Sequence, residues 1–421
     1  MFSAPQPRSR LYTTATAYGS GFLSALTGYR YEGHGTEDLE HALEAIYPDR
    51  IAVAAPMARV GIYLALKNLI QPGQKVILSP YTISDVVNMV LCAGGVPLFA
   101  DIEPGGSCNI DAGQVLKLLA SEQNIGAVMV THFYGLICNI DPILDACRAQ
   151  GIPVIEDAAQ AFGAKHNGRF AGTMSDGGIF SFGLLKNVTS FVGGAVITPH
   201  RELADHIRRD LKELPTYPKR ALMSKMAKGA AFDIATFKPA FELGVYWLFR
   251  HASLHGMNFF NNKLETDSKP VSYKQFPNRY AYRMSGAQAD LIRSQLDRVE
   301  RHTQERIAKA KIYDEGLRDL PGVVLPPMRT DGSHIYFYYP IQVENREALA
   351  LYMTEKLRDV QVSHHRNCAA MACFADYARD CPKAALAERR LIYLPTYPGY
   401  RDDQVRANVD VIRGFFQERR P

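Results

Sequence analysis

The sequence predicts an α/β protein with a large, mostly parallel sheet and a smaller α+β part at the C-terminus. Between residues 51 and 157, short apolar runs such as IAVAA and KVILSP alternate with helical patterns such as VGIYLALKNLI. That alternation implies right-handed crossovers and a sheet covered on both faces. With 421 residues, of which 47% are apolar and 22% charged, the chain can bury a sizeable core.

The chain divides into three parts. We expect an N-terminal arm and helix at 1–50, a large α/β domain at 51–276 with a helical insertion at about 214–276, and a C-terminal domain at 277–421. The last part begins with one long helix, from Tyr282 to about residue 320, and continues with strands including HIYFYYPIQV.

The insertion is rich in lysine and aromatic residues. Asp233, Lys238 and Glu242 interrupt its apolar residues, so it does not read as a membrane-spanning helix. The pattern is typical of helices that pack on the core or on a partner subunit. A lid, or a peripheral membrane or lipid contact through 229–250, is the alternative.

Composition excludes several classes of protein. A net charge of +5 is too small to indicate nucleic acid, although it suits an anionic small substrate. The seven cysteines form no CxxC pair, so we expect no metal site and reduced thiols in a cytoplasmic enzyme. Neither a GxSxG nor a GxGxxG motif is present, which argues against an α/β-hydrolase and a Rossmann dehydrogenase.

The stretch 154–198 carries the strongest chemical signal. VIEDAAQ places Asp157 at the end of an apolar strand, and IFSFGLLKN places Lys186 in the loop after another. A carboxylate can keep a pyridine nitrogen protonated, and a lysine can form an imine with an aldehyde. The pair therefore predicts pyridoxal 5′-phosphate (PLP) as cofactor.

Several motifs resemble those of the DegT/StrS-like sugar aminotransferases, which are fold-type I PLP enzymes. They are VIEDAAQAFGA, IFSFGLLKN, IAVAAPMARVGIYLALKNL, VPLFADIEP, THFYG, RMSGAQADLIRSQL and LPTYPGYRDDQV. The resemblance covers nearly the whole chain and implies that family's fold, cofactor and homodimeric assembly.

The resemblance also assigns roles by position. Lys186 corresponds to the catalytic, imine-forming lysine and Asp157 to the partner of the pyridine nitrogen. Gln160 corresponds to the residue at the ring's phenolic oxygen, and Ser181 to a phosphate ligand.

The remaining cofactor positions depart from the family pattern. Ala58 and Arg59 stand where a Ser-Gly-Thr phosphate grip is usual, and an arginine there could pair with the phosphate. Ile83 occupies the position that covers the ring, where relatives carry an aromatic residue. Ala281 and Gly286 replace an asparagine and an acidic residue, so the exact substrate is open.

Four residues are candidates for binding substrate: His132, Tyr134, Asn187 and His334. The resemblance implies transfer of an amino group from an amino acid, glutamate, to a nucleotide-linked keto sugar by a ping-pong mechanism. A sugar dehydratase, a transaminase of a non-nucleotide keto compound and an inactive regulatory homologue are the alternatives. The related dehydratases carry histidine at the position of Lys186, which favours transamination here.

Overall fold

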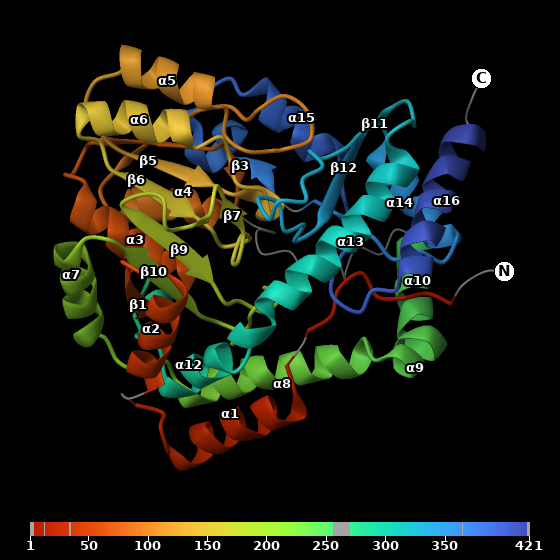
Figure 1. Cartoon of the computed structure of the whole chain (residues 1–421), viewed down its shortest axis with the longest axis horizontal. Coiled ribbons are helices and arrows are strands. Elements are labelled where there is room, and N and C mark those ends of the chain that lie inside the picture. The colour runs from red at the N-terminus through yellow and green to blue at the C-terminus, as the bar shows by residue number, and fades with distance from the viewer. Residues whose placement is uncertain (1–3, 12, 33–34, 256–269, 364, 419–421) are drawn as a thin grey trace.

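The computed structural model describes residues 4–11, 13–32, 35–255, 270–363 and 365–418. Its main feature is a seven-stranded sheet with the strand order β1-β10-β9-β6-β5-β2-β4 (Figure 1). The strands are β1 (Ile51–Ala55), β2 (Lys75–Leu78), β4 (Val96–Phe99), β5 (Ile125–Thr131), β6 (Val154–Asp157), β9 (Gly177–Ser181) and β10 (Gly194–Thr198). The neighbours from β9 to β4 pair in parallel, whereas β10 is antiparallel to both β1 and β9. The predicted mostly parallel sheet is confirmed.

Helices cover both faces of this sheet. One face carries α3 (Ala58–Leu69), α4 (Ser84–Cys92) and α7 (Arg201–Lys212); the other carries α2 (Gly35–Ile46), α5 (Ala112–Ser121) and α6 (Asp141–Gln150). Strand β5 shows how the sequence specifies two faces. Met129 belongs to the core under α3 and α4, while its neighbours Val128 and Val130 belong to the core under α5 and α6. Alternate residues of a strand point to opposite faces, so a strand buried on both sides is apolar throughout.

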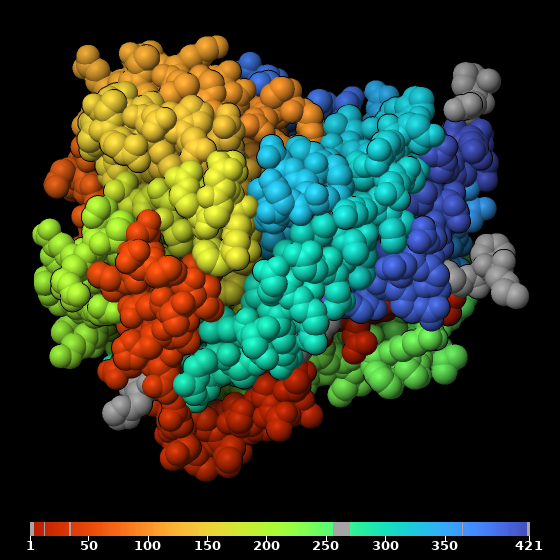
Figure 2. Space-filling model, viewed as in Figure 1, coloured from red at the N-terminus to blue at the C-terminus, as the bar shows by residue number. Residues whose placement is uncertain are grey.

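A second, antiparallel sheet lies in the C-terminal part, with the strand order β11-β12-β15-β13. Its strands are β11 (Val323–Val324), β12 (Tyr339–Val343), β13 (Gln361–Val362) and β15 (Leu391–Leu394). The helices α13 (Val299–Leu317), α14 (Arg346–Glu355) and α16 (Asp402–Glu418) share a core with it. In the space-filling view, α13 forms a teal band between the yellow part of the large-sheet region and the blue C-terminal residues (Figure 2).

Short elements connect the two parts. Strand β3 (Tyr81–Thr82) pairs with β14 (Arg366–Asn367), so a segment beyond β2 is tied to the C-terminal region. The remaining elements of the two parts are β7 (Lys165–His166), β8 (Arg169–Phe170), α15 (Pro382–Arg390) and the 3₁₀ turns Phe133–Gly135, Asn278–Tyr280, Leu296–Arg298, Cys368–Ala370 and Ala372–Tyr377.

The expected insertion is helical. It contains α8 (Lys219–Ala235), α9 (Lys238–Ala240), a π-helical turn (Phe241–Val245) and α10 (Tyr246–Leu254). Helix α8 packs on α1 (Ala15–Thr27), where the Tyr18 hydroxyl donates to Asp233 at 2.8 Å, and the two helices run along one edge of the molecule (Figure 1).

The insertion exposes several large apolar side chains between residues 234 and 248. They are Ile234, Phe237, Leu243, Trp247 and Leu248. Over the described ranges, no helix combines the length and the apolar character needed to cross a membrane. A peripheral membrane or lipid contact through 229–250 stays a prediction.

The single long helix expected from Tyr282 is wrong. Helix α12 (Gly286–Arg293) ends before α13 begins, and a 3₁₀ turn lies between them. Gln295 explains the break. Its side-chain amide turns inward, donating to Thr189 O at 2.7 Å and accepting from Thr189 N–H at 3.2 Å. Both bonds tie Gln295 to the loop that contains Lys186.

The expected strand HIYFYYPIQV is also too long. Only Tyr339–Val343 joins the small sheet. The preceding residues bond instead to the loop after β5, where Ile335 N donates to Gly135 O at 3.0 Å and Phe337 N to Tyr134 O at 2.8 Å. Those backbone groups are therefore unavailable to a ladder in the small sheet.

Candidate active site

The site lies where β5, β6 and β9 end. Asp157 is the last residue of β6 and pairs in register with Thr131, the last residue of β5. Ser181 ends β9, and the chain then turns back so that Phe182 N donates to Gly193 O at 2.9 Å. Ligands of parallel sheets bind beyond the carboxyl ends of the strands, so this edge is the expected place for chemistry.

Lys186 occupies the loop between β9 and β10. Its backbone N–H donates to Gly183 O at 3.2 Å, and its ammonium lies 5.2 Å from the centre of the Phe337 ring. Burial lowers the pKa of Lys186 to about 8, against an opposing effect of Asp157. A substantial fraction of this lysine is therefore neutral near pH 8, as a nucleophile or general base requires.

The pKa of Asp157 is shifted upward, opposite to that of Lys186. Burial raises its pKa, while the Ala159 N–H, Lys186 and His132 act in the opposite direction. The Oδ1 atom accepts from Ala159 N at 3.0 Å, and within the described residues no group donates a hydrogen bond to Oδ2. A buried carboxylate that retains acceptor capacity suits a cationic ring N–H.

The start of α3 suits a phosphate. Its N-cap, Met57, makes no side-chain capping bond, so the first N–H groups of the helix are left for another acceptor. Gly194 of β10 lies against it, because a Cβ there would come within 2.5 Å of the Ala58 nitrogen. Ser181, at the end of the adjacent strand β9, is partly exposed. These groups fit a phosphate, and together with Lys186 and Asp157 they fit PLP.

Gln160 is held in one orientation. Its Oε1 accepts from Tyr134 N–H at 2.9 Å, and its Nε2 lies 3.4 Å from His365 Nε2. The amide therefore donates toward the histidine, and one N–H remains for a further acceptor. His365 comes from the C-terminal part of the chain, and its Nδ1 lies 2.9 Å from the Tyr393 hydroxyl.

The Tyr134 hydroxyl lies inside a buried cluster of hydroxyl groups, and its expected contact with substrate stays a prediction. Its hydroxyl is buried between those of Tyr81, at 3.2 Å, and Tyr393, at 3.0 Å. Ser363 completes the cluster, with its hydroxyl 2.6 Å from Tyr81 and 2.5 Å from Tyr393. Tyr134 thus contributes to the site through its backbone N–H, which orients Gln160.

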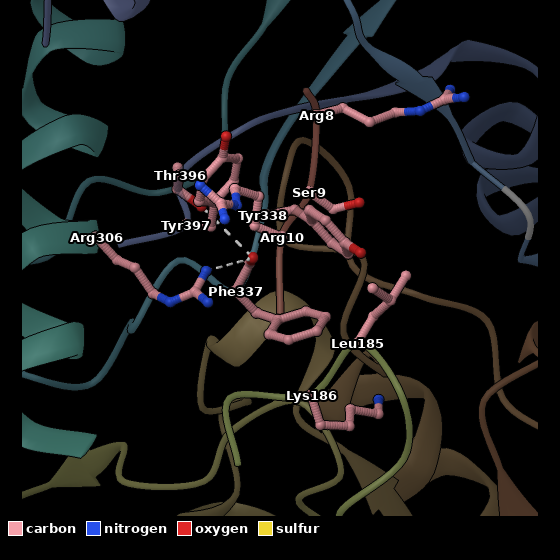
Figure 3. A pocket seen from close by; sticks show the side chains of 10 residues that line it. All are labelled: Arg8, Ser9, Arg10, Leu185, Lys186, Arg306, Phe337, Tyr338, Thr396 and Tyr397. Atoms are coloured by element: carbon pink, nitrogen blue, oxygen red, sulfur yellow. Dashed lines mark hydrogen bonds between the residues drawn. The ribbon is translucent and has the colours of Figure 1, made fainter. Parts of the chain in front are cut away.

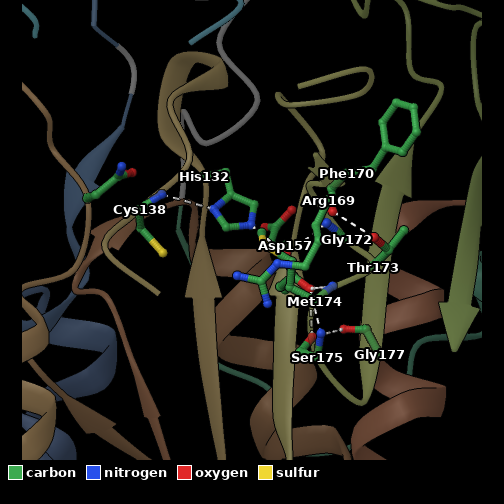
Figure 4. Close-up of polar contacts among 12 residues, drawn as sticks. His132, Cys138, Asp157, Arg169, Phe170, Gly172, Thr173, Met174, Ser175 and Gly177 are labelled. Carbon is green, nitrogen blue, oxygen red and sulfur yellow. Dashed lines mark hydrogen bonds and ion pairs between the residues drawn. The ribbon is translucent and has the colours of Figure 1, made fainter. Parts of the chain in front are cut away.

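The His132 ring is bonded on both sides within the protein, and its expected contact with substrate stays a prediction. Its Nε2 lies 3.0 Å from Glu156, and its Nδ1 accepts from Cys138 N–H at 3.2 Å, so both ring nitrogens are engaged (Figure 4). Glu156 in turn accepts from the backbone of Gly172 and Ser175. Glu156, the neighbour of Asp157, therefore fixes the loop beyond β6.

The two other substrate candidates carry unmatched acceptors. His334 is buried; its Nδ1 lies 3.2 Å from Pro327 O, and no described residue bonds to its Nε2. Burial lowers the pKa of His334 to about 3, so the ring is neutral. Asn187 directly follows Lys186, and its buried Oδ1 also has no hydrogen-bond partner in the described part of the chain.

Arg59 already has an anionic partner. Its guanidinium pairs with Asp85 in the first turn of α4 and donates to the Tyr280 hydroxyl at 2.8 Å. Ala58 is the first residue of α3, and Ile83 is the N-cap of α4. The phosphate contact expected for the Arg59 side chain would require it to leave or share Asp85.

Close packing explains why Gly286 stands where the family has an acidic residue. A Cβ at this position would lie 1.8 Å from Arg30 O, and the Gly286 N–H donates to Tyr31 O at 2.8 Å. The chain before α2 thus crosses the start of α12 too closely for any side chain. Ala281 directly follows the 3₁₀ turn Asn278–Tyr280 as its C-cap.

A narrow pocket opens above Lys186 (Figure 3). Its free volume is about 20 Å³, room for about one water molecule. The lining residues come from five separate segments of the chain: Arg8, Ser9, Arg10, Leu185, Lys186, Arg306, Phe337, Tyr338, Thr396 and Tyr397. Sequence reasoning missed Arg10, Arg306 and Phe337 as site residues, because nothing in their local patterns distinguishes them from arm, helix or loop positions.

The sheet order, the lysine after β9 and the carboxylate ending β6 define a fold-type I PLP-dependent transferase. The chain belongs to the DegT/DnrJ/EryC1/StrS aminotransferase family, which matches residues 24–413. It is therefore a PLP-dependent aminotransferase.

Relatives and solved structures agree with this membership. The spore coat polysaccharide biosynthesis protein SpsC of Bacillus subtilis is 28% identical over 399 residues, 92% of this chain and 91% of that protein. The GDP-perosamine synthase of Caulobacter vibrioides is 28% identical over 69% of this chain and 64% of its own length. The aminotransferase from Psychrobacter cryohalolentis shares the fold, with a TM-score of 0.76 and 19% identity over 98% of this chain and 99% of that one.

Proposed function

We propose that the protein transfers an amino group from glutamate to a nucleotide-linked keto sugar, in a ping-pong reaction that uses Lys186 twice. The observation that carries this proposal is the placement of Lys186 and Asp157 at neighbouring strand ends: Asp157 ends β6, and Lys186 lies in the loop after β9, which pairs in parallel with β6. Burial lowers the pKa of Lys186 and raises that of Asp157, and each charge opposes the shift of the other.

Each side chain then has a defined task. PLP, when bound, supplies an electron sink for the carbanion formed at the substrate carbon. Lys186, whose pKa burial lowers to about 8, would in its neutral form take the proton from that carbon and deliver it to C4′ of the cofactor, and would move a proton in the reverse direction in the second half-reaction. Asp157 would keep the ring nitrogen protonated, and Gln160 would donate its remaining N–H to the phenolic oxygen.

Three groups would hold the cofactor in place. The N-terminus of α3 at Ala58 and the Ser181 hydroxyl would bind the phosphate, and Ile83 would cover the ring. Arg59 supports this end of the site by fixing Asp85, or reaches the phosphate when Asp85 releases it. Asn187 and His334 offer acceptors to the substrate.

A sugar acceptor is supported by what similar proteins are named for. Besides the GDP-perosamine synthase, a dTDP-4-dehydro-2,3,6-trideoxy-D-glucose 4-aminotransferase from Saccharopolyspora spinosa is 26% identical over 80% of this chain and 77% of that protein. Both names indicate nucleotide-linked sugars, and polysaccharide biosynthesis is the process named for SpsC.

The experiment incubates the purified protein with PLP, glutamate and a set of keto-sugar nucleotides, and measures the mass of the products. An amino sugar is expected, with none from a Lys186→Ala variant. Release of ammonia with a deoxy product would instead show a dehydratase. Amination of a keto compound without a nucleotide would remove that part of the proposal, and absence of PLP binding would indicate an inactive homologue.

We further propose a homodimer located in the cytoplasm, with the domain division at 51–276 and 277–421 expected from the sequence. Light scattering of the purified protein tests the assembly, since a single-chain mass would contradict it. Cell fractionation tests the location and, through 229–250, the alternative of a membrane contact.

A further inference from the structure

The pocket above Lys186 is strongly basic. Of its ten lining residues, four are arginine or lysine, and none is aspartate or glutamate. Phe337 lies close to two of these cations, with its ring centre 5.2 Å from Lys186 Nζ and 5.6 Å from Arg306 Cζ (Figure 3). Like charges gathered in a pocket of low dielectric repel one another, so the pocket favours an anion.

Two of the cations have identified tasks. Arg8 pairs with Asp359, with Nε 3.4 Å from Oδ1, and donates to Val360 O at 2.8 Å. Arg306 is buried and donates to Phe337 O at 2.9 Å. Its position is therefore set by the backbone of the pocket wall.

Arg10 is the cation on which the site depends. Within the described residues, no carboxylate lies within ion-pair distance of its guanidinium, and its buried Nε has no hydrogen-bond partner. Burial raises the pKa of the nearby Asp233 and the charge of Arg10 opposes that rise, but Asp233 Oδ2 accepts from the Tyr18 hydroxyl at 2.8 Å. A buried guanidinium donor that lacks an acceptor is costly unless a ligand supplies one.

The N-terminal segment holds Arg10 in this position. Gln6 donates to Gly399 O at 3.2 Å, and the Tyr397 hydroxyl donates to Pro7 O at 2.8 Å. Arg8 adds its backbone N–H to Asp359 at 2.9 Å. Three successive residues thus tie the segment to the C-terminal part of the chain and carry Arg10 to the pocket that also contains Lys186.

We propose that Arg10 binds an anionic oxygen group of a substrate, a carboxylate or a phosphate, in the pocket beside Lys186. Arg306 adds positive charge behind it. A guanidinium can hold either group through two parallel N–H bonds, and the free Nε of Arg10 is one of the donors needed. This site deepens the proposed function and rests on it for the statement that the anion belongs to a substrate.

The test measures anion binding to the PLP-loaded protein by calorimetry, with no turnover. Succinate is the carboxylate probe, and dTDP is the phosphate probe. The wild type should bind at least one of them, and Arg10→Gln should weaken that binding roughly tenfold or more, as loss of a charge-assisted pair requires. The probe that responds identifies the source of the anion, amino donor or nucleotide-linked acceptor.

Arg318→Gln is the matched control, because Arg318 is exposed and pairs only with Asp314 in its own helix and with that residue's carbonyl. It should bind both probes as the wild type does. Equal binding by Arg10→Gln and the wild type, or no binding of either probe by the wild type, would overturn the site. If Arg10→Gln does not fold, Arg10→Lys decides: weaker binding is expected, because an ammonium cannot form the two parallel bonds.

The outcomes separate this site from the proposed function. Loss of probe binding in Arg10→Gln, with no amino transfer to any sugar by the wild type, would refute the function and leave the anion site. Transfer to a sugar by the wild type, with equal probe binding by Arg10→Gln and the wild type, would support the function and refute the anion site.

Discussion

His132 Nε2 lies 3.0 Å from Glu156 Oε2, and neither side chain is exposed to solvent. The pair joins the end of β5 to the end of β6, directly beside the Lys186–Asp157 pair. Glu156 also accepts from the backbone of Gly172, Met174 and Ser175 at 2.8 to 2.9 Å. One buried carboxylate therefore holds the loop that supports the active-site edge.

Glu156→Gln should destabilise the protein by about 2 to 4 kcal/mol, because an amide cannot accept at all the positions that the carboxylate fills and leaves buried donors unsatisfied. The urea midpoint of unfolding measures the loss. Glu347→Gln is the control, since Glu347 is 70% exposed and pairs with its neighbour Arg346. A shift no larger than in the control would show that the pair does not stabilise the fold.

Glu156→Gln should also change how the free energy of unfolding depends on pH in acid. Burial alone would raise the pKa of Glu156, but the bonds from His132, Gly172 and Ser175 outweigh it and hold the pKa below the ordinary value of 4.5. A depressed carboxyl pKa contributes stability above pH 4.5 that is lost as the pH falls through the folded-state value. The wild type should therefore lose more stability than Glu156→Gln between neutral pH and about pH 3. A constant difference between their unfolding free energies over that range would contradict this.

Lys186 should combine with PLP only when it is neutral. Because burial lowers its pKa to about 8, the rate at which the PLP-free protein gains the absorbance of lysine-bound PLP should rise with pH and level off above about 8. Asp157→Asn should move that midpoint lower, since the carboxylate raises the pKa of the lysine. Stopped-flow absorbance measures both. An unchanged midpoint in Asp157→Asn would show that the two groups do not interact.

Gly286→Asp, which restores the family's acidic residue, should disrupt the crossing with Arg30. The Cβ would overlap Arg30 O, so we expect a loss of about 1 to 3 kcal/mol or more in stability. Gly19→Ala is the matched control: Gly19 lies within α1 with open space around its Cβ position, and alanine should stabilise the helix by up to about 1 kcal/mol. Thermal unfolding compares them, and a neutral Gly286→Asp would refute the packing explanation.

His365→Ala should weaken PLP binding by about three- to tenfold, because Gln160 loses the partner that fixes its amide. PLP affinity and the absorption maximum of bound PLP are the measurements, and His365→Gln should restore both in part. His200→Ala provides the control, since His200 is 52% exposed and pairs with Asp176 away from the site. A purely structural role would lower stability and leave the absorption maximum in place.

The sequence by itself determined the sheet, the family and the central chemistry. Strand and helix periods are local, and the stretch 154–198 carries Asp157, Gln160, Ser181 and Lys186 within one contiguous motif. Their placement at neighbouring strand ends follows from parallel pairing, which needs no further information.

The tertiary structure decided the roles that depend on distant partners. His132 and Tyr134 resemble pocket residues in sequence, yet Glu156 and the tyrosine cluster occupy their polar atoms. Arg10 lies in the N-terminal arm and His365 in the C-terminal part, and only long-range hydrogen bonds bring them to the cofactor site. Local patterns cannot encode such contacts, because they join residues hundreds of positions apart and depend on how the two sheets pack.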